Sequence, residues 1–286
     1  MIEQRRRRYA GYWTNELAVA GEGPPLILLH GFSDSAETWR PVLECLDAYG
    51  RAGVAVDLVG FGEADAAEPG PTLPQLDRFV AELVTTHAGG AGVVLVGNSL
   101  GAGLTVRASQ NPGLPVAAAV PIAVPGLGFR ALVNRSVQWS PRLTDAALRV
   151  PMPAGVLRRG AGLVMPSLLY GSRRAADPAV VARFAALVPN SRAALALART
   201  GRALLVELDC GYEFEQVRCP TLVVHGARDR LIPPSASRQL HEGVAGSELV
   251  ILPSSGHCPQ LDDPYRVAQL ILDFADRAAP EKERHA

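Results

Sequence analysis

A serine stands between two glycines at the end of an apolar run, in the stretch VVLVGNSLGAG from Val93 to Gly103. Glycine and serine are common turn residues, so the pattern alone indicates only that a buried strand ends there. A serine hydroxyl is a weak nucleophile at neutral pH and needs a neighbouring base to take its proton. Because Gly97 and Gly101 lie two residues to either side, Ser99 can occupy the strained turn that exposes a nucleophile. The stretch predicts a catalytic serine if a base and an acid accompany it.

Two further groups follow apolar runs later in the chain. Asp229 lies in VVHGARDRLIPP, and His257 lies in SSGHCPQLDDP. Taken alone, the first is typical of a loop aspartate or a helix cap, and the second of a turn histidine. Together with Ser99 they have the order Ser, Asp, His, in which the histidine is the base and the carboxylate orients it. The other histidines are assigned structural places at strand ends, on helices or in the C-terminal tail: His30, His225, His87, His241 and His285.

Short apolar runs and amphipathic segments alternate along most of the chain. The strands and helices that they predict must position Ser99, Asp229 and His257. The predicted strands are residues 26–29, 54–56, 93–96, 117–124, 221–225 and 248–252. The predicted helices open at Ser35, Thr72, Leu100 and Asp263, because apolar residues follow each at helical spacing. Strands that are apolar on both faces and alternate with helices indicate a parallel sheet covered by helices. The carboxyl ends of parallel strands face one crevice, so Ser99, Asp229 and His257 are expected to meet there.

Two segments depart from this regularity. Pro121 lies inside the predicted strand 117–124, where it cannot donate a ladder hydrogen bond. Residues 125–210 lose the strand rhythm and become rich in proline, arginine and alanine. The predicted organisation is therefore a core of residues 1–124 and 211–286, with residues 125–210 inserted as a helical cap. The apolar stretch from Leu163 to Tyr170 either lines a pocket or belongs to the core of that cap.

The motifs as a set resemble the α/β-hydrolase superfamily. LLHGF, GNSLG, VVHGARDRLIPP and SSGHCPQLDDP stand where motifs of that superfamily stand, and the likeness extends roughly over residues 9–124 and 211–278. The resemblance implies a mostly parallel, eight-stranded sheet flanked by helices, with an inserted helical cap. It also implies that Ser99 is the nucleophile, His257 the base and Asp229 the acid. The oxyanion hole would consist of the backbone amides of Phe32 and Leu100.

The function implied by this set is hydrolysis of a small or medium carboxylic ester through an acyl-enzyme. Two alternatives use the same triad: a cofactor-free carbon–carbon bond hydrolase and a perhydrolase. A third is a ligand-binding protein on this fold that is not an enzyme. Ser99 argues against relatives that use an aspartate nucleophile on carbon–halogen bonds or epoxides. Cys258 stands where many carbon–carbon hydrolases have tryptophan, and Lys282, in the tail, is the only lysine of the chain.

The composition limits the other classes of function. The 286 residues carry 28 basic and 28 acidic side chains, so the net charge gives no case for nucleic acid binding. No apolar run is long enough to span a membrane, and Arg5 to Arg8 are interpreted as a solvated tail. Four cysteines without a C-x-x-C pair fit reduced thiols and a cytoplasmic location. No cofactor or metal motif is found, and the expected partner is a small-molecule ester.

The charge is unevenly distributed. Residues 125–210 contain 12 arginines and four acidic residues, a net of +8, and the rest of the chain balances it. Two interpretations remain open: ordinary solvated helix faces, or arginines near the crevice that attract anionic substrates. The second concerns Arg130, Arg135, Arg142, Arg149, Arg158, Arg159, Arg173 and Arg174. Outside this segment, Asp57 is interpreted as a group that orders its own loop.

Overall fold

The computed structural model describes residues 1–129, 145–146, 149–150, 152–208 and 212–278. These residues form one eight-stranded sheet in the order β1-β2-β4-β3-β5-β6-β7-β8. β1 pairs with β2 and β2 with β4 in antiparallel fashion, whereas every later pair in the order is parallel. The expected mostly parallel sheet is thereby confirmed. The strands are β1 Glu3–Tyr9, β2 Tyr12–Val19, β3 Glu22–Leu29, β4 Arg51–Val56, β5 Val93–Asn98, β6 Val116–Ile122, β7 Leu222–Gly226 and β8 Glu248–Leu252.

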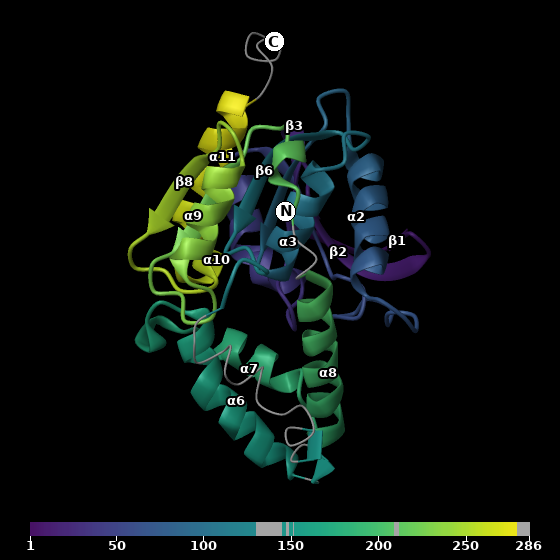
Figure 1. Cartoon of the computed structure of the whole chain (residues 1–286), viewed down its shortest axis with the longest axis vertical. Coiled ribbons are helices and arrows are strands. Elements are labelled where there is room, and N and C mark those ends of the chain that lie inside the picture. The colour runs from purple at the N-terminus through teal and green to yellow at the C-terminus, as the bar shows by residue number, and fades with distance from the viewer. Residues whose placement is uncertain (130–144, 147–148, 151, 209–211, 279–286) are drawn as a thin grey trace.

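Helices flank the sheet and extend beyond one of its ends. Figure 1 shows α6, α7 and α8 gathered at the bottom of the view, beneath the sheet and its flanking helices. The α-helices of the described chain are α1 Arg40–Ala48, α2 Leu73–His87, α3 Leu100–Ser109, α6 Ala154–Leu169, α7 Pro178–Ala186, α8 Ser191–Leu208, α9 Pro234–Gly243, α10 Pro259–Asp262 and α11 Pro264–Ala278. The short 3₁₀ helices among the described residues are η1 Ala36–Trp39, η2 Arg173–Ala175 and η3 Phe214–Gln216.

The central strands bury both faces. Leu26 and Leu28 of β3 belong to a core cluster that includes apolar residues of α1 and α11. Ile27 and Leu29 of the same strand belong to a second cluster, which includes α2 and α3. Because successive side chains of a strand point to opposite faces, this alternation places one pair of helices on each side of the sheet. Each predicted helix buries apolar residues at the expected spacing, as Trp39 in η1 and Leu43 in α1 illustrate.

Arg5 to Arg8 are not a solvated tail. They belong to β1, which pairs with β2 along its whole length at the edge of the sheet. Arg5 Nε donates to Glu16 Oε1 at 2.6 Å, and the guanidinium of Arg6 lies 5.7 Å from the centre of the Trp13 ring. An edge strand needs no apolar alternation, and charged side chains protect it from pairing with other chains. This is why the arginine run has no hydrophobic pattern and still forms a strand.

Pro121 lies inside β6, a central strand, at a point where the ladder is interrupted. The amides of Ala119 and Ala123 donate across to Pro220 and Val224. The position between them would donate toward β7 as well, but proline has no N–H. Pro121 therefore removes one hydrogen bond from the ladder with β7. The pairing of Pro121 with Gly97 of β5 does not use the missing N–H. The proline is thus compatible with a central strand.

Helices α6, α7 and α8 form the cap, and α8 also contacts the core at the start of α2. Thr72 precedes α2 as predicted, but its side chain makes no capping hydrogen bond. Instead, Glu207 of α8 accepts from the amides of Thr72 and Leu73, at 3.1 and 2.5 Å. A carboxylate at a helix N-terminus satisfies unpaired amides and interacts favourably with the helix dipole. The cap therefore supplies a capping group that the local sequence of α2 does not.

Candidate active site

Ser99 occupies a strained turn between β5 and α3. Its φ of 53° and ψ of −116° are unfavourable for a residue with a Cβ atom. A Cβ on Gly97 would lie 2.1 Å from the carbonyl oxygen of Gly101, and a Cβ on Gly101 would lie 2.2 Å from that of Leu29. Both glycines are therefore required for the turn to close. The amide of Ser99 donates to the carbonyl of Ile122 at 2.9 Å, which fixes the turn to the neighbouring strand.

The structure brings His257 and Asp229 together. His257 follows β8, Asp229 follows β7, and His257 Nδ1 lies 2.7 Å from Asp229 Oδ2. Asp229 is fully buried, and its Oδ1 accepts from the amides of Leu231 and Ile232 at 2.7 and 3.0 Å. These two amides fix the carboxylate, which leaves Oδ2 directed at the imidazole. A carboxylate in this position holds Nδ1 in its protonated form and so presents Nε2 as the acceptor.

The pKa of Asp229 is held low by the charge of His257 and by hydrogen bonds. Burial alone would raise it, but the charge interaction with His257 and the hydrogen bonds from His225, His257 and the Ile232 amide outweigh burial. The pKa lies well below the ordinary value for an aspartate. Asp229 is accordingly ionised throughout the pH range in which an imidazole could act as a base.

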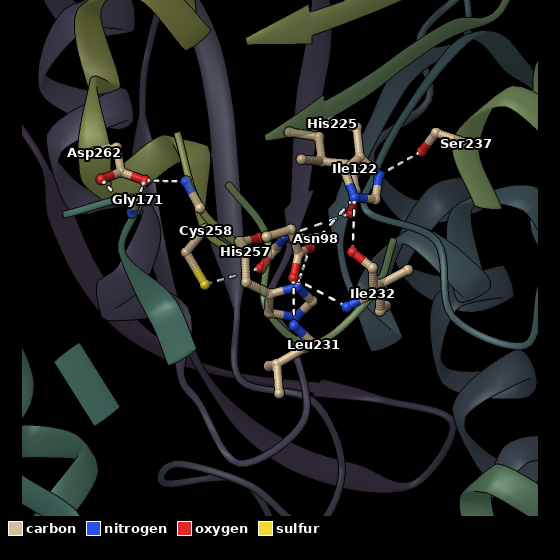
Figure 2. A network of polar contacts seen from close by, with 12 residues as sticks. Asn98, Ile122, Gly171, His225, Leu231, Ile232, Ser237, His257, Cys258 and Asp262 are labelled. Atoms are coloured by element: carbon tan, nitrogen blue, oxygen red, sulfur yellow. Dashed lines mark hydrogen bonds and ion pairs between the residues drawn. The ribbon is translucent and has the colours of Figure 1, made fainter. Parts of the chain in front are cut away.

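His225 is a second histidine beside the same acid. It is completely buried, as expected of a packed strand-end histidine, and its Nε2 lies 3.4 Å from Asp229 Oδ2. Its Nδ1 lies 2.7 Å from Ser237 Oγ, and its Nε2 lies 3.1 Å from the carbonyl of Ile232, as Figure 2 shows. Sequence reasoning gave it no link to Asp229. The sequence signal for this contact was that His225 and Asp229 lie four residues apart, so a tight turn after the strand can bring them together.

Asn98 connects the serine turn to the histidine loop, and sequence reasoning missed it. Its Nδ2 donates to the carbonyl of His257 at 2.9 Å. Its Oδ1 accepts from Gln260 Nε2 at 3.2 Å. It also accepts from Cys258 Sγ at 3.4 Å (Figure 2). Because Asn98 directly precedes Ser99, these bonds tie the segments that carry the serine and the histidine to each other.

The histidine loop is also tied to the cap. The amide of Cys258 donates to the carbonyl of Leu169 at 2.9 Å. Asp262 accepts from the amide of Gly171 at 3.0 Å and from that of Gly256 at 2.7 Å (Figure 2). Residues just after α6 and residues around His257 are thus held by the same carboxylate.

The two amides expected to form an oxyanion hole belong to Phe32 and Leu100, which line the same cavity as Ser99. Leu100 is the first residue of α3, so its amide has no partner within the helix. Within the part of the chain that the structure describes, neither amide has a recorded hydrogen-bond partner. Both groups are available to a bound molecule.

The loop that carries Phe32 is fixed by two buried side chains. His30 Nε2 accepts from the amide of Leu58 at 2.8 Å, and its Nδ1 donates to the carbonyl of Gly31 at 2.7 Å. Burial lowers the pKa of His30, which favours this neutral form. Asp57 accepts from the amides of Ala36 and Glu63 at 2.7 and 2.8 Å. The interpretation of Asp57 as a loop-ordering group is consistent with these contacts.

Ser99 and His257 line a cavity of about 530 Å³ between the core and the cap. Most of its wall is apolar. Helices α6 and α8 of the cap supply much of that wall through Met165, Leu168, Leu169, Leu197, Leu204 and Leu205. Of the stretch from Leu163 to Tyr170, three residues therefore line the pocket, whereas Leu163 is 62% exposed. A cavity of this size accommodates a small organic ligand.

The arginines singled out from the sequence do not line this cavity where the structure describes them. Arg149, Arg158, Arg159, Arg173 and Arg174 are exposed and are not among its lining residues. Arg130, Arg135 and Arg142 lie outside the described residues. Arg202 does line the cavity, and its Nη2 is paired with Asp145 at 2.5 Å.

Among the residues with described positions, no group of three His, Cys, Asp or Glu side chains could hold a metal ion. No single helix of the described chain is long and apolar enough to cross a membrane. Only α7 and α8 taken together, bent by 91°, meet the criteria of length and composition.

Comparison of sequences finds relatives over most of the chain. An uncharacterised protein of Mycobacterium tuberculosis (strain ATCC 25618 / H37Rv) is 27% identical over 272 residues, which cover 92% of this chain and 78% of the relative. A 2-hydroxy-6-oxononadienedioate/2-hydroxy-6-oxononatrienedioate hydrolase of Klebsiella pneumoniae is 26% identical over 88% of this chain and 87% of the relative. A pimeloyl-[acyl-carrier protein] methyl ester esterase of Vibrio cholerae is 25% identical over 93% and 98%.

Comparison of structures agrees on the fold. A thermophilic esterase from Thermogutta terrifontis superposes with a TM-score of 0.71 at 21% identity, covering 97% of this chain and all of the other. The sequence model of the alpha/beta hydrolase family matches residues 26–270, which is most of the chain. The predicted superfamily is thus confirmed, and the chain belongs to the alpha/beta hydrolase family.

Proposed function

We propose that the protein is a serine hydrolase that cleaves a small or medium carboxylic ester. Ser99 is the nucleophile, His257 the general base, Asp229 the orienting acid, and the amides of Phe32 and Leu100 the oxyanion hole. One observation carries the proposal: His257, held by Asp229 at 2.7 Å, and Ser99, held in a strained turn, line the same cavity. Neither glycine beside the turn can be replaced without a clash, so the turn keeps Ser99 in its strained conformation.

The reaction follows from these positions. His257 Nε2 takes the hydroxyl proton of Ser99 as Oγ attacks the ester carbonyl, and a tetrahedral intermediate forms. Its negative oxygen accepts from the amides of Phe32 and Leu100. The imidazolium returns the proton to the alkoxide oxygen as the carbon–oxygen bond breaks, so the alcohol leaves and the acyl group stays on Ser99. A water molecule, deprotonated by the same imidazole, releases the acid and restores the serine.

A second candidate is cleavage of a carbon–carbon bond by the same triad. Its support is the Klebsiella pneumoniae relative, whose named substrates are nonadienedioates and nonatrienedioates, compounds that carry two carboxylates. The cavity favours the ester reading, because its wall is largely apolar and Arg202 is paired with Asp145. A perhydrolase with the same triad is the remaining catalytic alternative. A panel of neutral esters, a vinylogous diketone and hydrogen peroxide with a carboxylic acid separates the three reactions.

A fluorophosphonate probe tests whether the serine is a nucleophile at all. We expect the wild-type protein to be labelled at one site and Ser99→Ala to be unlabelled, because the probe reacts only with an activated serine. Ser33→Ala is the matched control, since Ser33 lines the same cavity and should label as the wild type does. Equal labelling of wild type and Ser99→Ala would refute the assignment. A wild-type protein that neither labels nor turns over any ester would point to a ligand-binding protein on this fold.

The proposal extends to organisation and location. We take residues 1–124 and 211–286 as the catalytic core and residues 125–210 as its cap. The support for this division is that helices α6, α7 and α8 all contribute residues to the cavity wall. Cytoplasmic location is proposed from the cysteines, since Cys45, Cys219 and Cys258 are free thiols in the structure. Fractionation of cells that express the full chain tests the location.

A further inference from the structure

One carboxylate in the cavity wall has no part in the reaction above. Asp34 follows the oxyanion loop, is 3% exposed, and is among the residues that line the cavity. Of the described lining residues it alone is acidic. Its Oδ1 accepts from the amide of Ser35 at 2.8 Å. A buried carboxylate is costly unless it is paired, so its presence in an apolar wall requires an explanation.

The partner of this carboxylate comes from the cap. Arg183 of α7 places its Nη2 3.7 Å from Asp34 Oδ1. That nitrogen is buried and has no hydrogen-bond partner among the residues the structure describes. The two charges are close enough to compensate each other, although the distance exceeds that of a hydrogen bond. Burial raises the pKa of Asp34, and the positive charge of Arg183 opposes that rise and favours the ionised carboxylate. Arg183 therefore lies beside the cavity with a carboxylate as its partner.

The arginine that lines the cavity is also paired, although it shares its carboxylate with a second arginine. Arg202 is paired with Asp145 at 2.5 Å, and the same carboxylate binds Arg199 at 2.8 Å. A substrate carboxylate in this cavity would compete with Asp145 for Arg202, and it would lie near the carboxylate of Asp34. An uncharged apolar group would meet neither obstacle.

We infer that Asp34 is a specificity-determining residue, which neutralises Arg183 and makes the cavity select uncharged apolar substrates over substrates that carry a carboxylate. The inference rests on the proposed ester hydrolysis and narrows its substrate class. It assigns to Asp34 and Arg183 a role in selection alone, because neither contacts Ser99, His257 or Asp229 through a recorded hydrogen bond or ion pair within the described chain.

Two esters of equal carbon count test the inference: 4-nitrophenyl hexanoate, which is neutral, and 4-nitrophenyl hydrogen adipate, which ends in a carboxylate. We expect the wild type to prefer the hexanoate ester in kcat/KM. Asp34→Asn keeps the shape and removes the carboxylate that is ion-paired with Arg183, so it should reduce that preference by roughly tenfold or more. Asp34→Asn with Arg183→Gln should restore most of the preference, because the freed cation is gone.

The matched control is Asp77→Asn, which breaks a carboxylate–arginine pair of α2 and α3 outside the cavity. Asp77 binds Arg107 at 2.8 and 2.6 Å, and its replacement should leave the preference unchanged. If Asp34→Asn does not fold, Arg183→Gln alone tests the same pair in the opposite direction. It leaves the charge of Asp34 uncompensated, so the preference for hexanoate should increase several-fold.

A binding measurement separates this inference from the proposed reaction. In the Ser99→Ala background, titration calorimetry compares monomethyl adipate, which carries one carboxylate, with methyl hexanoate, which is neutral, and Asp34→Asn should strengthen binding of monomethyl adipate about tenfold relative to methyl hexanoate. A preference that Asp34→Asn leaves unchanged, in turnover or in binding, overturns the role of Asp34. A protein that binds methyl hexanoate with this selectivity but hydrolyses no ester refutes the reaction and leaves the selectivity standing. A protein that neither hydrolyses 4-nitrophenyl hexanoate nor binds methyl hexanoate overturns both.

Discussion

Cys258 follows His257 directly and lines the same cavity, so its thiol is the nearest rival to Ser99 as nucleophile. Burial raises the pKa of the thiol well above its ordinary value, and the charges of Asp34 and Asp229 add to the effect. The thiolate is the reactive form of cysteine, so a thiol held protonated is inert. Its Sγ donates to Asn98 Oδ1 at 3.4 Å, which assigns Cys258 to packing.

Cys258→Ala should therefore keep its ester turnover within roughly threefold of the wild type, because only a small packing group and one weak hydrogen bond are lost. Steady-state hydrolysis of 4-nitrophenyl hexanoate measures this. Alkylation of the folded protein with iodoacetamide should leave Cys258 unmodified, as peptide mapping can show. A loss of turnover beyond roughly a hundredfold, with the fold intact, would give the thiol a catalytic part.

At the level of single residues, the sequence predicted which residues form the candidate site but not all of their contacts. The candidate site residues could be named because their motifs stand in a fixed order, and Asp229 and His257 do meet. Asn98 could not be assigned its contacts, because they depend on how the turn after β5 meets the loop after β8. That loop lies far from Asn98 in sequence.

At the scale of elements, the turn between β5 and α3 depends on glycine more than on hydrogen bonding. Gly101→Ala would place a Cβ 2.2 Å from the carbonyl oxygen of Leu29, and the backbone on both sides belongs to the core. We expect it to destabilise the protein by roughly 3 kcal/mol or more. Gly160→Ala, in the exposed middle of α6, meets nothing within 4 Å and should stabilise by roughly 0.5–1 kcal/mol.

Thermal unfolding of the two alanine variants checks this pair. A melting temperature below the wild type for Gly101→Ala and at or above it for Gly160→Ala is the expected pattern. Equal tolerance at both positions would mean that the turn can relax without strain, which the positions of Gly97 and Gly101 argue against.

The basic surface of the cap is a second element-scale feature. Its described arginines from the predicted set are exposed, and the cavity arginine is paired with Asp145. Exposed charges are screened over about 8 Å at physiological ionic strength. Of the two interpretations of the arginine excess, the structure favours solvated helix faces for the arginines that it describes.

Raising NaCl from 20 to 500 mM should then change kcat/KM of the neutral and the carboxylate-bearing 4-nitrophenyl esters in parallel. A selective fall for the carboxylate-bearing ester would instead show that cap arginines steer anions toward the cavity. In that event the arginines outside the described residues, Arg130, Arg135 and Arg142, would be replaced first.

For the molecule as a whole, the sheet and its flanking helices were predictable because both faces of the central strands are apolar. The antiparallel edge was not: β1 has no apolar alternation, and its pairing depends on Glu16 of β2, which lies eleven residues from Arg5. The position of the cap over the cavity was not predictable either. It depends on tertiary contacts such as that of Glu207 with the start of α2.

Glu16 also sets an acid limit on stability. It is fully buried, and burial alone would raise its pKa. Hydrogen bonds from His87, Tyr9 and Arg5 outweigh burial and lower the pKa from 4.5 to about 2. Because the pKa of Glu16 is lower in the folded protein than in the unfolded chain, the ionised carboxylate stabilises the protein fully at pH values above the unfolded-state pKa. This stabilisation is lost as pH falls from about 4.5 toward 2.

Glu16→Gln should accordingly lower the free energy of unfolding most at neutral pH. The difference from wild type should shrink by up to about 3 kcal/mol as pH falls from 6 to 2.5. Urea unfolding across this range measures it, with Glu63→Gln, an exposed position, as the control for net charge. A difference that stays constant with pH would remove the stabilising role of the ionised form.

The central claim is that Ser99, His257 and Asp229 act as one catalytic unit, and kcat for 4-nitrophenyl hexanoate tests it most directly. Ser99→Ala and His257→Ala should each lower kcat by roughly 10⁴-fold or more, and Asp229→Asn should lower it by less than either. The double variant Ser99→Ala with His257→Ala should be no slower than the worse single variant, because the parts of a unit are not additive. A Ser99→Ala protein that is folded and keeps more than about a tenth of the wild-type kcat would contradict the account.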